Sequence, residues 1–174
     1  MSILIFKFVS DFEFYFVMPK DLDRHIFEYS EITSQIYIGA NACCKIHLKD
    51  ELVHKGINAE INLEENETET PIGLEAYLWL PTKDDFAPNF AQLEIGARAL
   101  EGMIRHNKKV LVHCLNGHGR SPTLVIAYFL AQGWTLEDAL KLIKEKRPEI
   151  HLTEYQLRAL EEWKEWIKNT RTHR

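Results

Sequence analysis

The sequence predicts a single α/β domain with a central, mostly parallel, twisted sheet flanked by helices. Strand-like runs alternate with helix-like runs along most of the chain, which is the pattern of a parallel sheet with helices on both sides. The length of 174 residues is that of one domain with a substantial core. A hydrophobic content of 45% and a charged content of 27% are ordinary for a soluble globular protein.

The first residues, Met1–Val17, are rich in Phe and Ile. Asp11 and Glu13 interrupt this apolar run, and neither a basic start nor an A-x-A-like cleavage site accompanies it, so it does not fit a signal peptide. It is also too short and too charged to span a bilayer. Two interpretations stay open, an extra strand or an extension that precedes a true start at Met18. The expected parts of the chain are an N-terminal extension over residues 1–24, the domain over residues 25–168 and a frayed C-terminal tail over residues 169–174.

Three runs predict the first strands of the sheet. Glu31–Gly39 is rich in Ile and ends at a glycine. Ile57–Leu63 alternates apolar and polar positions, which is typical of a strand with one buried face. Glu75–Leu80 is the third strand, and a proline stops it. Between the first two strands, Ala42–Lys55 has spaced apolar residues among charges, which predicts a short helix.

Two loops and a helix are expected next. The acidic run Glu64–Thr70 indicates a solvated turn rather than a metal site. The polar loop Thr82–Pro88 leads into the helix, and we expect Pro88 in its first turn, where the missing N–H is not needed. Asn107 is the expected end of this helix. Its apolar residues recur at steps of three and four: Phe90, Leu93, Ala97, Leu100 and Ile104.

The remaining elements surround a glycine-bearing loop. Lys109–His113 predicts a strand, and the apolar stretch Leu124–Ala131 predicts a helix that Gly133 ends. Two further helices are expected to begin at the capping boxes Thr135–Asp138 and Thr153–Gln156. The last helix should bury an apolar face made of Leu157, Leu160, Trp163, Trp166 and Ile167.

Charge and cysteine usage exclude some functions. A net charge of −5 gives no reason to expect binding to nucleic acid or to a membrane. Three cysteines, of which Cys43 and Cys44 are adjacent, do not make a disulfide framework and fit a reducing, cytoplasmic location. His113, Cys114 and His118 have no second Cys/His cluster to complete a zinc site, so we expect no metal and no other cofactor.

The loop after the Lys109–His113 strand is the candidate site. Cys114 and Arg120 stand five residues apart, a spacing that is weak evidence alone. Here, however, the loop lies between a strand and a helix, where a parallel sheet binds its ligands. Gly117 and Gly119 let the backbone curl and turn its N–H groups inward to form an anion nest. Ser121, followed by Pro122, is expected to cap the helix as its N-cap.

These residue types suit phosphoryl transfer. The helix N-terminus, the inward N–H groups and Arg120 favour the thiolate form of Cys114, which is the nucleophile. Arg120 can hold two phosphoryl oxygens, and Ser121 can donate a hydrogen bond to the departing thiolate. His113 is expected to orient the loop through hydrogen bonds rather than to act as a base. A leaving alkoxide or phenoxide needs a general acid, for which Asp84 and Asp85 are candidates.

The run from His113 to Ser121 resembles the phosphate-binding loop of the cysteine-dependent protein tyrosine phosphatases, and within them the small atypical dual-specificity branch. The likeness extends from about Glu31 to about Trp166. It implies Cys114 as the nucleophile of a phosphocysteine intermediate, with the roles of Arg120 and Ser121 as above. The phosphate-binding residues that it implies are Leu115, Asn116, Gly117, His118, Gly119 and Arg120.

The resemblance also ranks the acids. The general acid of the family stands in a Pro-x-x-Asp-x-x-x-Pro loop, which Pro81–Pro88 matches with Asp84 in the acidic place and Asp85 as the fallback. Gln156 falls where some compact members keep a glutamine near the pocket, although its place in a capping box explains it equally well. No stretch resembles the aromatic loop that deepens the pocket of tyrosine-only phosphatases.

The implied function is therefore a protein phosphatase that hydrolyses phosphotyrosine and also phosphoserine and phosphothreonine. Its partner is a phosphorylated protein, and the sequence does not indicate an oligomeric state. One alternative is a phosphatase of a phosphoinositide, an RNA 5′-phosphate or a sugar phosphate. Another is a non-catalytic phosphate-binding module, because a fold does not guarantee activity. An arsenate-reducing or sulfur-transfer enzyme is a weaker alternative.

Overall fold

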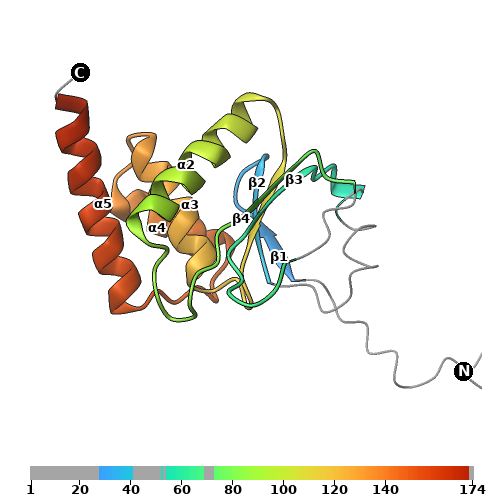
Figure 1. The fold of residues 1–174 in the computed structure, drawn as a ribbon, viewed down its shortest axis with the longest axis horizontal. Coiled ribbons are helices and arrows are strands. Elements are labelled where there is room, and N and C mark those ends of the chain that lie inside the picture. The colour runs from blue at the N-terminus through green and yellow to red at the C-terminus, as the bar shows by residue number, and fades with distance from the viewer. Residues whose placement is uncertain (1–27, 41–51, 53, 69–72, 173–174) are drawn as a thin grey trace, which may run out of the picture.

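The computed structural model describes residues 28–40, 52, 54–68 and 73–172 (Figure 1). Within these residues, five strands form one sheet in the order β1-β2-β5-β3-β4, and four helices follow or separate them. The predicted single α/β domain is confirmed. The elements are β1 (Tyr29–Glu31), β2 (Ile36–Gly39), β3 (Ala59–Asn62), β4 (Ala76–Trp79), α2 (Phe90–Arg105), β5 (Val110–His113), α3 (Arg120–Ala131), α4 (Leu136–Lys146) and α5 (Glu154–Thr172).

The sheet is parallel except at one edge. β5 lies at its centre, parallel to β2 and β3, and β4 continues the parallel pairing beyond β3. The strand predicted over Glu31–Gly39 is confirmed for Ile36–Gly39 alone, since Glu31 belongs to β1, which pairs antiparallel with β2. Thr33 explains the reversal, because its hydroxyl accepts a hydrogen bond from the Ile36 backbone N–H at 3.0 Å and folds the chain back.

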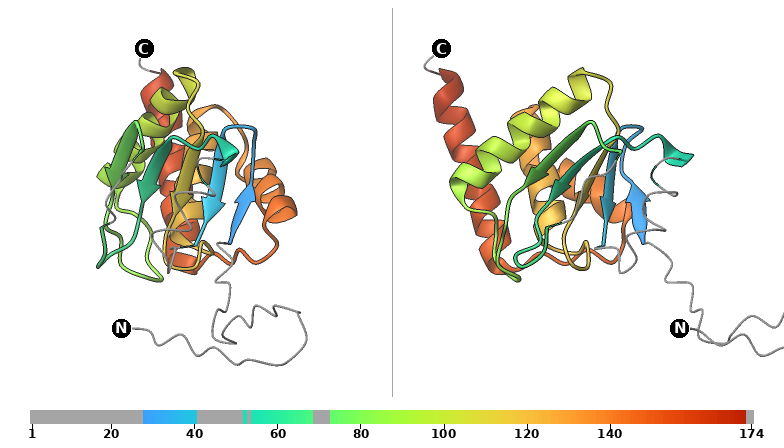
Figure 2. Two further views of the ribbon diagram at one scale, coloured as in Figure 1. Left: turned by 90° about the vertical axis from the view of Figure 1, so that its right-hand side faces the viewer. Right: turned by 45° about the vertical axis from the view of Figure 1, so that its right-hand side comes forward.

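The four helices lie on one face of the sheet, and two views of the molecule show the strands uncovered by them on the other (Figures 1 and 2). α3 packs at the centre of this layer, against the sheet and the other helices, and ten of its twelve residues are buried. On the opposite face, Tyr37 and Leu111 pack with Leu52 and Ile57. Leu52, His54 and Lys55 have helical backbone conformation, and they are the described part of the helix predicted over Ala42–Lys55.

Two helices begin at other residues than those predicted. α2 begins at Phe90 with Asn89 as its N-cap, so Pro88 precedes the helix instead of lying in its first turn. Asn89 and Gln92 form a capping box, and this competing local signal determines the start. α3 begins at Arg120 with Gly119 as its N-cap, so Ser121 lies inside the helix and does not cap it.

The predicted ends and the two later capping boxes agree with the structure. Asn107 and Gly133 follow α2 and α3 with positive φ values of 57° and 93°, the left-handed conformation that ends helices. Thr135 caps α4 by accepting a hydrogen bond from the Asp138 N–H. α5 continues to Thr172, so the frayed tail expected from residue 169 is wrong for residues 169–172.

The face of α5 is narrower than predicted, because Leu157 is 37% exposed while Leu160, Trp163 and Ile167 are buried. Trp163 donates a hydrogen bond from Nε1 to the carbonyl oxygen of Ala127 in α3 at 2.9 Å, which satisfies its polar atom inside the core. None of the helices within the described ranges is both long enough and apolar enough to cross a membrane.

Several predictions concern residues outside the described ones. They are the interpretation of Met1–Val17, the pair Cys43 and Cys44, and most of the helix expected over Ala42–Lys55.

The two glycines of α2 test how closely this helix packs on α3. A Cβ at Gly96 would lie 2.6 Å from Cδ1 of Leu124 and 2.9 Å from Cδ1 of Leu80, whereas a Cβ at Gly102 would meet nothing within 4 Å. Gly102→Ala should raise the free energy of unfolding by about 1 kcal/mol through helix propensity. Gly96→Ala brings the same gain against an overpacking cost of about 1–3 kcal/mol, so it should be neutral or destabilising. Urea unfolding of both variants measures the difference, and equal stabilisation would contradict this packing.

Candidate active site

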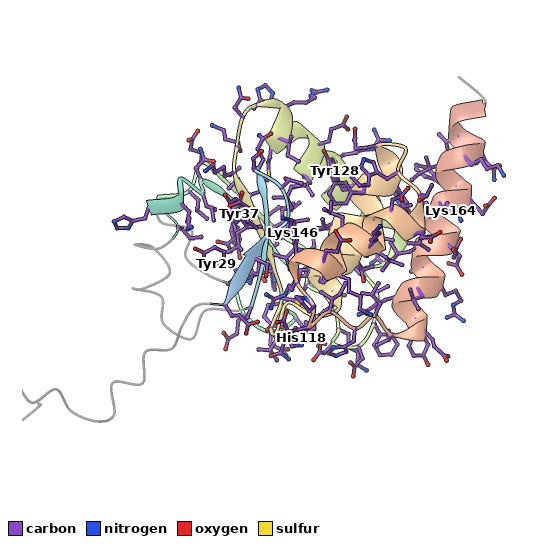
Figure 3. The ribbon with its side chains drawn as sticks, turned by 180° about the vertical axis from the view of Figure 1, so that it is seen from behind. Tyr29, Tyr37, His118, Tyr128, Lys146 and Lys164 are labelled. Atoms are coloured by element: carbon purple, nitrogen blue, oxygen red, sulfur yellow. The ribbon has the colours of Figure 1, made fainter. Side chains whose placement is uncertain are left out.

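A pocket lies at the end of the sheet where β4 and β5 lead into their following loops. Figure 1 shows these loops and the connection from α4 to α5 along the lower edge of the molecule, and Figure 3 shows His118 at the same edge. The parallel strands therefore present their carboxyl ends to the pocket, as expected for this fold class. The pocket is lined by Asp84, Asp85, Cys114, Asn116, His118, Gly119, His151, Thr153 and Gln156.

Cys114 follows the last residue of β5 and is 2% exposed. Its Sγ lies 3.4 Å from Oγ of Ser121, in the first turn of α3. This contact explains why Ser121 does not cap the helix, because its hydroxyl faces the thiol instead. The structure thus brings together the two groups that the sequence predicts to exchange a hydrogen bond.

Glycine is required at position 117 of the loop. Gly117 has a φ of +67°, and a Cβ there would lie 2.5 Å from the carbonyl oxygen of Gly39 and 2.9 Å from Nη2 of Arg147. A larger residue would have to displace the backbone of β2. The sequence predicts a glycine here only because the loop has to curve.

Arg147 holds the loop between β5 and α3 through its carbonyl oxygens, and the sequence did not predict this role. The buried guanidinium donates from Nε to the carbonyl oxygen of Gly117 at 2.9 Å and from Nη2 to that of Asn116 at 3.0 Å. Its outer side pairs with Glu28 at 3.2 Å and contacts Ser30 at 3.3 Å. The C-terminal end of α4 therefore fixes the loop between β5 and α3 and links it to β1.

The three guanidinium nitrogens of Arg120 have different surroundings. Nη1 donates to Oε1 of Glu64 at 3.0 Å, to the carbonyl oxygen of Thr82 at 2.9 Å and, more weakly, to that of Leu63 at 3.4 Å. Nη2 lies 3.0 Å from Oδ1 of Asp84. Nε is buried without any hydrogen-bond partner. An unpartnered buried donor is rare and unfavourable, and an oxyanion bound across Nε and Nη2 would satisfy it.

Glu64 corrects the prediction of a solvated acidic loop. Its side chain is buried against Arg120, its N–H donates to Oδ1 of Asn62 at 2.6 Å, and its carbonyl oxygen accepts from Nε1 of Trp79 at 2.8 Å. The residue lies two positions after the end of β3, where the Arg120 side chain reaches it. Of the described residues in this run, those at 65–68 are exposed and fit the predicted turn.

His113 does not bond to the loop as predicted. Its Nε2 lies 3.0 Å from Oε1 of Glu60 on β3, and both side chains are buried. Its Nδ1 has no partner. Glu60 was not foreseen, because the alternation of β3 assigns it to the face away from the helices, where a carboxylate is ordinarily solvated. The residue that directly precedes Cys114 therefore belongs to a buried imidazole–carboxylate pair.

The two candidate acids both line the pocket but differ in their contacts. Asp84 pairs with Nη2 of Arg120, and its side chain is 59% exposed. Asp85 occupies a positive φ of 65°, which a non-glycine residue rarely adopts. The structure therefore places only Asp84 in contact with the guanidinium.

Gln156 combines the two interpretations that the sequence left open. Its Oε1 accepts from the Thr153 N–H at 3.0 Å and its N–H donates to Oγ1 of Thr153 at 3.3 Å, which completes the capping box. The same buried side chain lines the pocket, and a Cβ at Gly119 would lie 2.8 Å from its Nε2.

The rim residues of the loop are polar or exposed. Leu115 is exposed and is not part of the lining, whereas Asn116 and His118 line the pocket. The His118 ring lies 5.2 Å from that of His151. Burial lowers the pKa of His118, and Arg147 and His151 lower it further, so the imidazole is uncharged at neutral pH.

The arrangement can carry out nucleophilic phosphoryl transfer. It combines a buried thiol, a hydroxyl beside it, a guanidinium with an unpartnered donor and a carboxylate at the mouth. Across the described part of the chain, no group of three or more His, Cys, Asp or Glu side chains could hold a metal ion.

Comparisons with known proteins agree with this chemistry. The sequence pattern described as dual specificity phosphatase, catalytic domain, matches residues 36–166. The tyrosine-protein phosphatase yvh1 of Schizosaccharomyces pombe is 32% identical over 124 residues, which are 69% of this chain and 36% of yvh1. The chain therefore spans only about a third of the length of that relative.

Solved structures share the fold. The structure of PTPMT1 in complex with PI(5)P has a TM-score of 0.72 and 23% identity, covering 82% of this chain and 97% of that chain. A mutant form of Tk-PTP has a TM-score of 0.71 and 30% identity, covering 81% of this chain and 97% of that chain. On these grounds the chain belongs to the dual-specificity phosphatase family, whose members are cysteine-dependent phosphatases.

Proposed function

We propose that this phosphatase hydrolyses phosphotyrosine, and also phosphoserine and phosphothreonine, in protein substrates. Cys114 is the nucleophile, Arg120 holds the phosphoryl group and Asp84 is the general acid. The observation that carries the proposal is Arg120 itself, whose Nη1 is held by the protein while its buried Nε has no hydrogen-bond partner among the described residues. Such a guanidinium is prepared for a tetrahedral oxyanion before the substrate arrives.

The reaction then follows in two steps. The thiolate of Cys114 attacks phosphorus while Nε and Nη2 of Arg120 hold two phosphoryl oxygens, and Asp84 protonates the leaving oxygen. In the second step water attacks the phosphocysteine, Asp84 accepts the proton of the water, and the Ser121 hydroxyl donates to the returning thiolate. The 3.4 Å contact between Cys114 and Ser121 supports this role of the hydroxyl.

Asp84 and the substrate compete for the same donor. Asp84 lies 3.0 Å from Nη2 of Arg120, where a bound phosphoryl oxygen would accept its hydrogen bond. A phosphoryl oxygen that accepts the same N–H displaces the carboxylate from the guanidinium. The displaced carboxylate is then available to the leaving oxygen, so binding and general-acid catalysis are coupled.

The lining of the pocket favours a phosphorylated protein over a phosphoinositide. PTPMT1 shares the fold and is known in complex with PI(5)P, which makes a lipid the second candidate. A polyphosphorylated headgroup, however, needs several cations. Among the residues that line the pocket there is no Lys or Arg, whereas Asp84 and Asp85 are both acidic. A phosphomonoester carried by a peptide needs only the loop and Arg120.

A substrate panel tests the proposal. We expect turnover of phosphotyrosine and phosphothreonine peptides and little of phosphoinositides, RNA 5′-phosphates or sugar phosphates. Cys114→Ser should abolish turnover of every substrate while it still binds vanadate or phosphate, because the loop and Arg120 remain. Turnover by the serine variant would contradict the mechanism, and a preference for a phosphoinositide would contradict the substrate class. Phosphate binding by the wild type without any turnover would indicate the non-catalytic module.

Asp84→Asn should lower kcat by about 100-fold or more for phenyl phosphate, whose leaving group needs a proton, and far less for p-nitrophenyl phosphate. Inorganic phosphate should bind this variant more tightly, because the competing carboxylate is gone. Asp85→Asn is the matched control and should show neither effect. The same leaving-group dependence in Asp85→Asn instead would move the general acid by one residue.

Arg120→Lys should reduce kcat/KM by about 100-fold or more although the charge is kept. An ammonium cannot contact Glu64 and Thr82 on one side and also present two donors to an oxyanion on the other. Steady-state kinetics with p-nitrophenyl phosphate measure the loss, and thermal unfolding checks that the variant folds. Near-normal activity would show that charge alone suffices.

A further inference from the structure

The loop that carries Asp84 is fastened to the first turn of α5 at three points. Oγ1 of Thr153 donates to the carbonyl oxygen of Asp85 at 2.8 Å, and Nε2 of Gln156 donates to that of Phe86 at 3.1 Å. The rings of Phe86 and Tyr155 stack with their centroids 5.0 Å apart and an interplanar angle of 22°. These partners are about 70 residues apart in sequence, so the contacts join two separate parts of the chain.

The hydrogen bonds use donors that the capping box leaves free. Within the box, Oγ1 of Thr153 and Oε1 of Gln156 both act as acceptors. The hydroxyl hydrogen and the amide N–H₂ are therefore still available, and both are directed at carbonyl oxygens of the Asp84 loop. A capping box by itself needs no such partners, so these two bonds are an additional property of this helix N-terminus.

The loop has few internal contacts with which to hold its shape. The turn Lys83–Phe86 is closed by one backbone hydrogen bond, from the Phe86 N–H to the Lys83 carbonyl oxygen at 3.2 Å. Asp85 occupies a left-handed conformation within it, which persists only where the surroundings impose it. The contacts from Thr153 and Gln156 fall on this residue and the next one.

The aromatic stack lies at the surface. Phe86 is 40% exposed and Tyr155 is 52% exposed. Nζ of Lys83 lies 5.1 Å from the Phe86 ring centre, and the guanidinium of Arg158 lies 5.7 Å from the Tyr155 ring centre. Each of the two stacked rings thus also contacts a cation, one from the loop and one from α5, and these contacts favour the stack without burial.

We propose that Thr153, Tyr155 and Gln156 form a clamp that fixes the backbone of the Asp84 loop next to the phosphate-binding loop. This proposal rests on the role of Asp84 as general acid. Gln156 also packs against Gly119 at the start of α3, so one amide contacts both loops and sets their separation. The three side chains are positioning residues, since they act on the reaction through Asp84.

The clamp determines how Asp84 moves. With the backbone of Asp85 and Phe86 held, Asp84 leaves Nη2 of Arg120 by rotation of its own side chain rather than by movement of the whole loop. Its 59% exposed side chain has room for such a rotation. The carboxylate therefore reaches the leaving oxygen from a fixed point, and loss of the clamp should impair proton donation more than it impairs binding of phosphate.

Tyr155→Ala tests the clamp, since this exposed residue can be truncated without loss of core packing. We expect kcat for phenyl phosphate to fall about tenfold, which is less than the loss expected for Asp84→Asn. The kcat for p-nitrophenyl phosphate should fall much less. The rate at which iodoacetate alkylates Cys114 should not change. Tyr155→Phe keeps the stack and should restore wild-type kinetics. Leu157→Ala, which truncates another exposed apolar residue of α5, is the matched control.

A double variant separates the clamp from its alternatives. Tyr155→Ala added to Asp84→Asn should cause no further loss with phenyl phosphate, because both changes act through one group. Three results would overturn the clamp: additive losses in the double variant, equal losses for both leaving groups, or a loss confined to KM for phosphotyrosine peptides. The third result would show instead that the Phe86–Tyr155 stack binds the aromatic ring of the substrate. If Asp84→Asn itself shows no leaving-group dependence, the proposed general acid fails instead.

Discussion

The anchoring of Arg120 is the interaction on which the rest of the site depends. Its Nη1 joins the first residue of α3 to the loops that follow β3 and β4, through Glu64 and the carbonyl oxygen of Thr82. Without these acceptors a buried guanidinium would be strongly destabilising, because desolvation of a charge exceeds what partial pairing returns. The same contacts occupy Nη1, so that Nη2 and the unpartnered Nε are left for an oxyanion. Arg120 therefore serves the fold and the phosphate site together, because the contacts that join the loops also hold its guanidinium in position.

Much of the site follows from local sequence. Cys114 and Arg120 are close in sequence, and the strand before the loop and the helix after it are continuous apolar runs. The supporting residues could not be found in this way, because their partners are distant in the chain. Glu64 is 56 residues from Arg120, and Arg147 is 30 residues from the loop carbonyl oxygens that it holds. In a single sequence, Glu64 looks like one of several exposed acids, and Glu60 like the polar half of an alternating strand.

The errors at helix starts have a common physical cause, which is competition between local signals. Pro88 and Asn89 both favour a start of α2, and the one that can form a reciprocal capping box determines it. Ser121 is a good N-cap by type, yet its hydroxyl is directed toward a thiol, and the glycine before Arg120 occupies the cap position. Gln156 shows the converse, since one side chain serves a cap and a pocket together. The limits of the domain and the cytoplasmic location stay predictions.

Arg147 also sets the direction of peptide dipoles. In a trans peptide the C=O and the N–H point in opposite directions, and the described residues contain no cis peptide. Because the carbonyl oxygens of Asn116 and Gly117 point at the buried guanidinium, the N–H groups of Gly117 and His118 point away from it. Arg147 thus orients two peptide dipoles of the loop before a substrate binds, although its own donors are used by the carbonyl oxygens. The loop then needs little reorganisation as negative charge develops, and the electrostatic character of the pocket is decided partly at the end of α4.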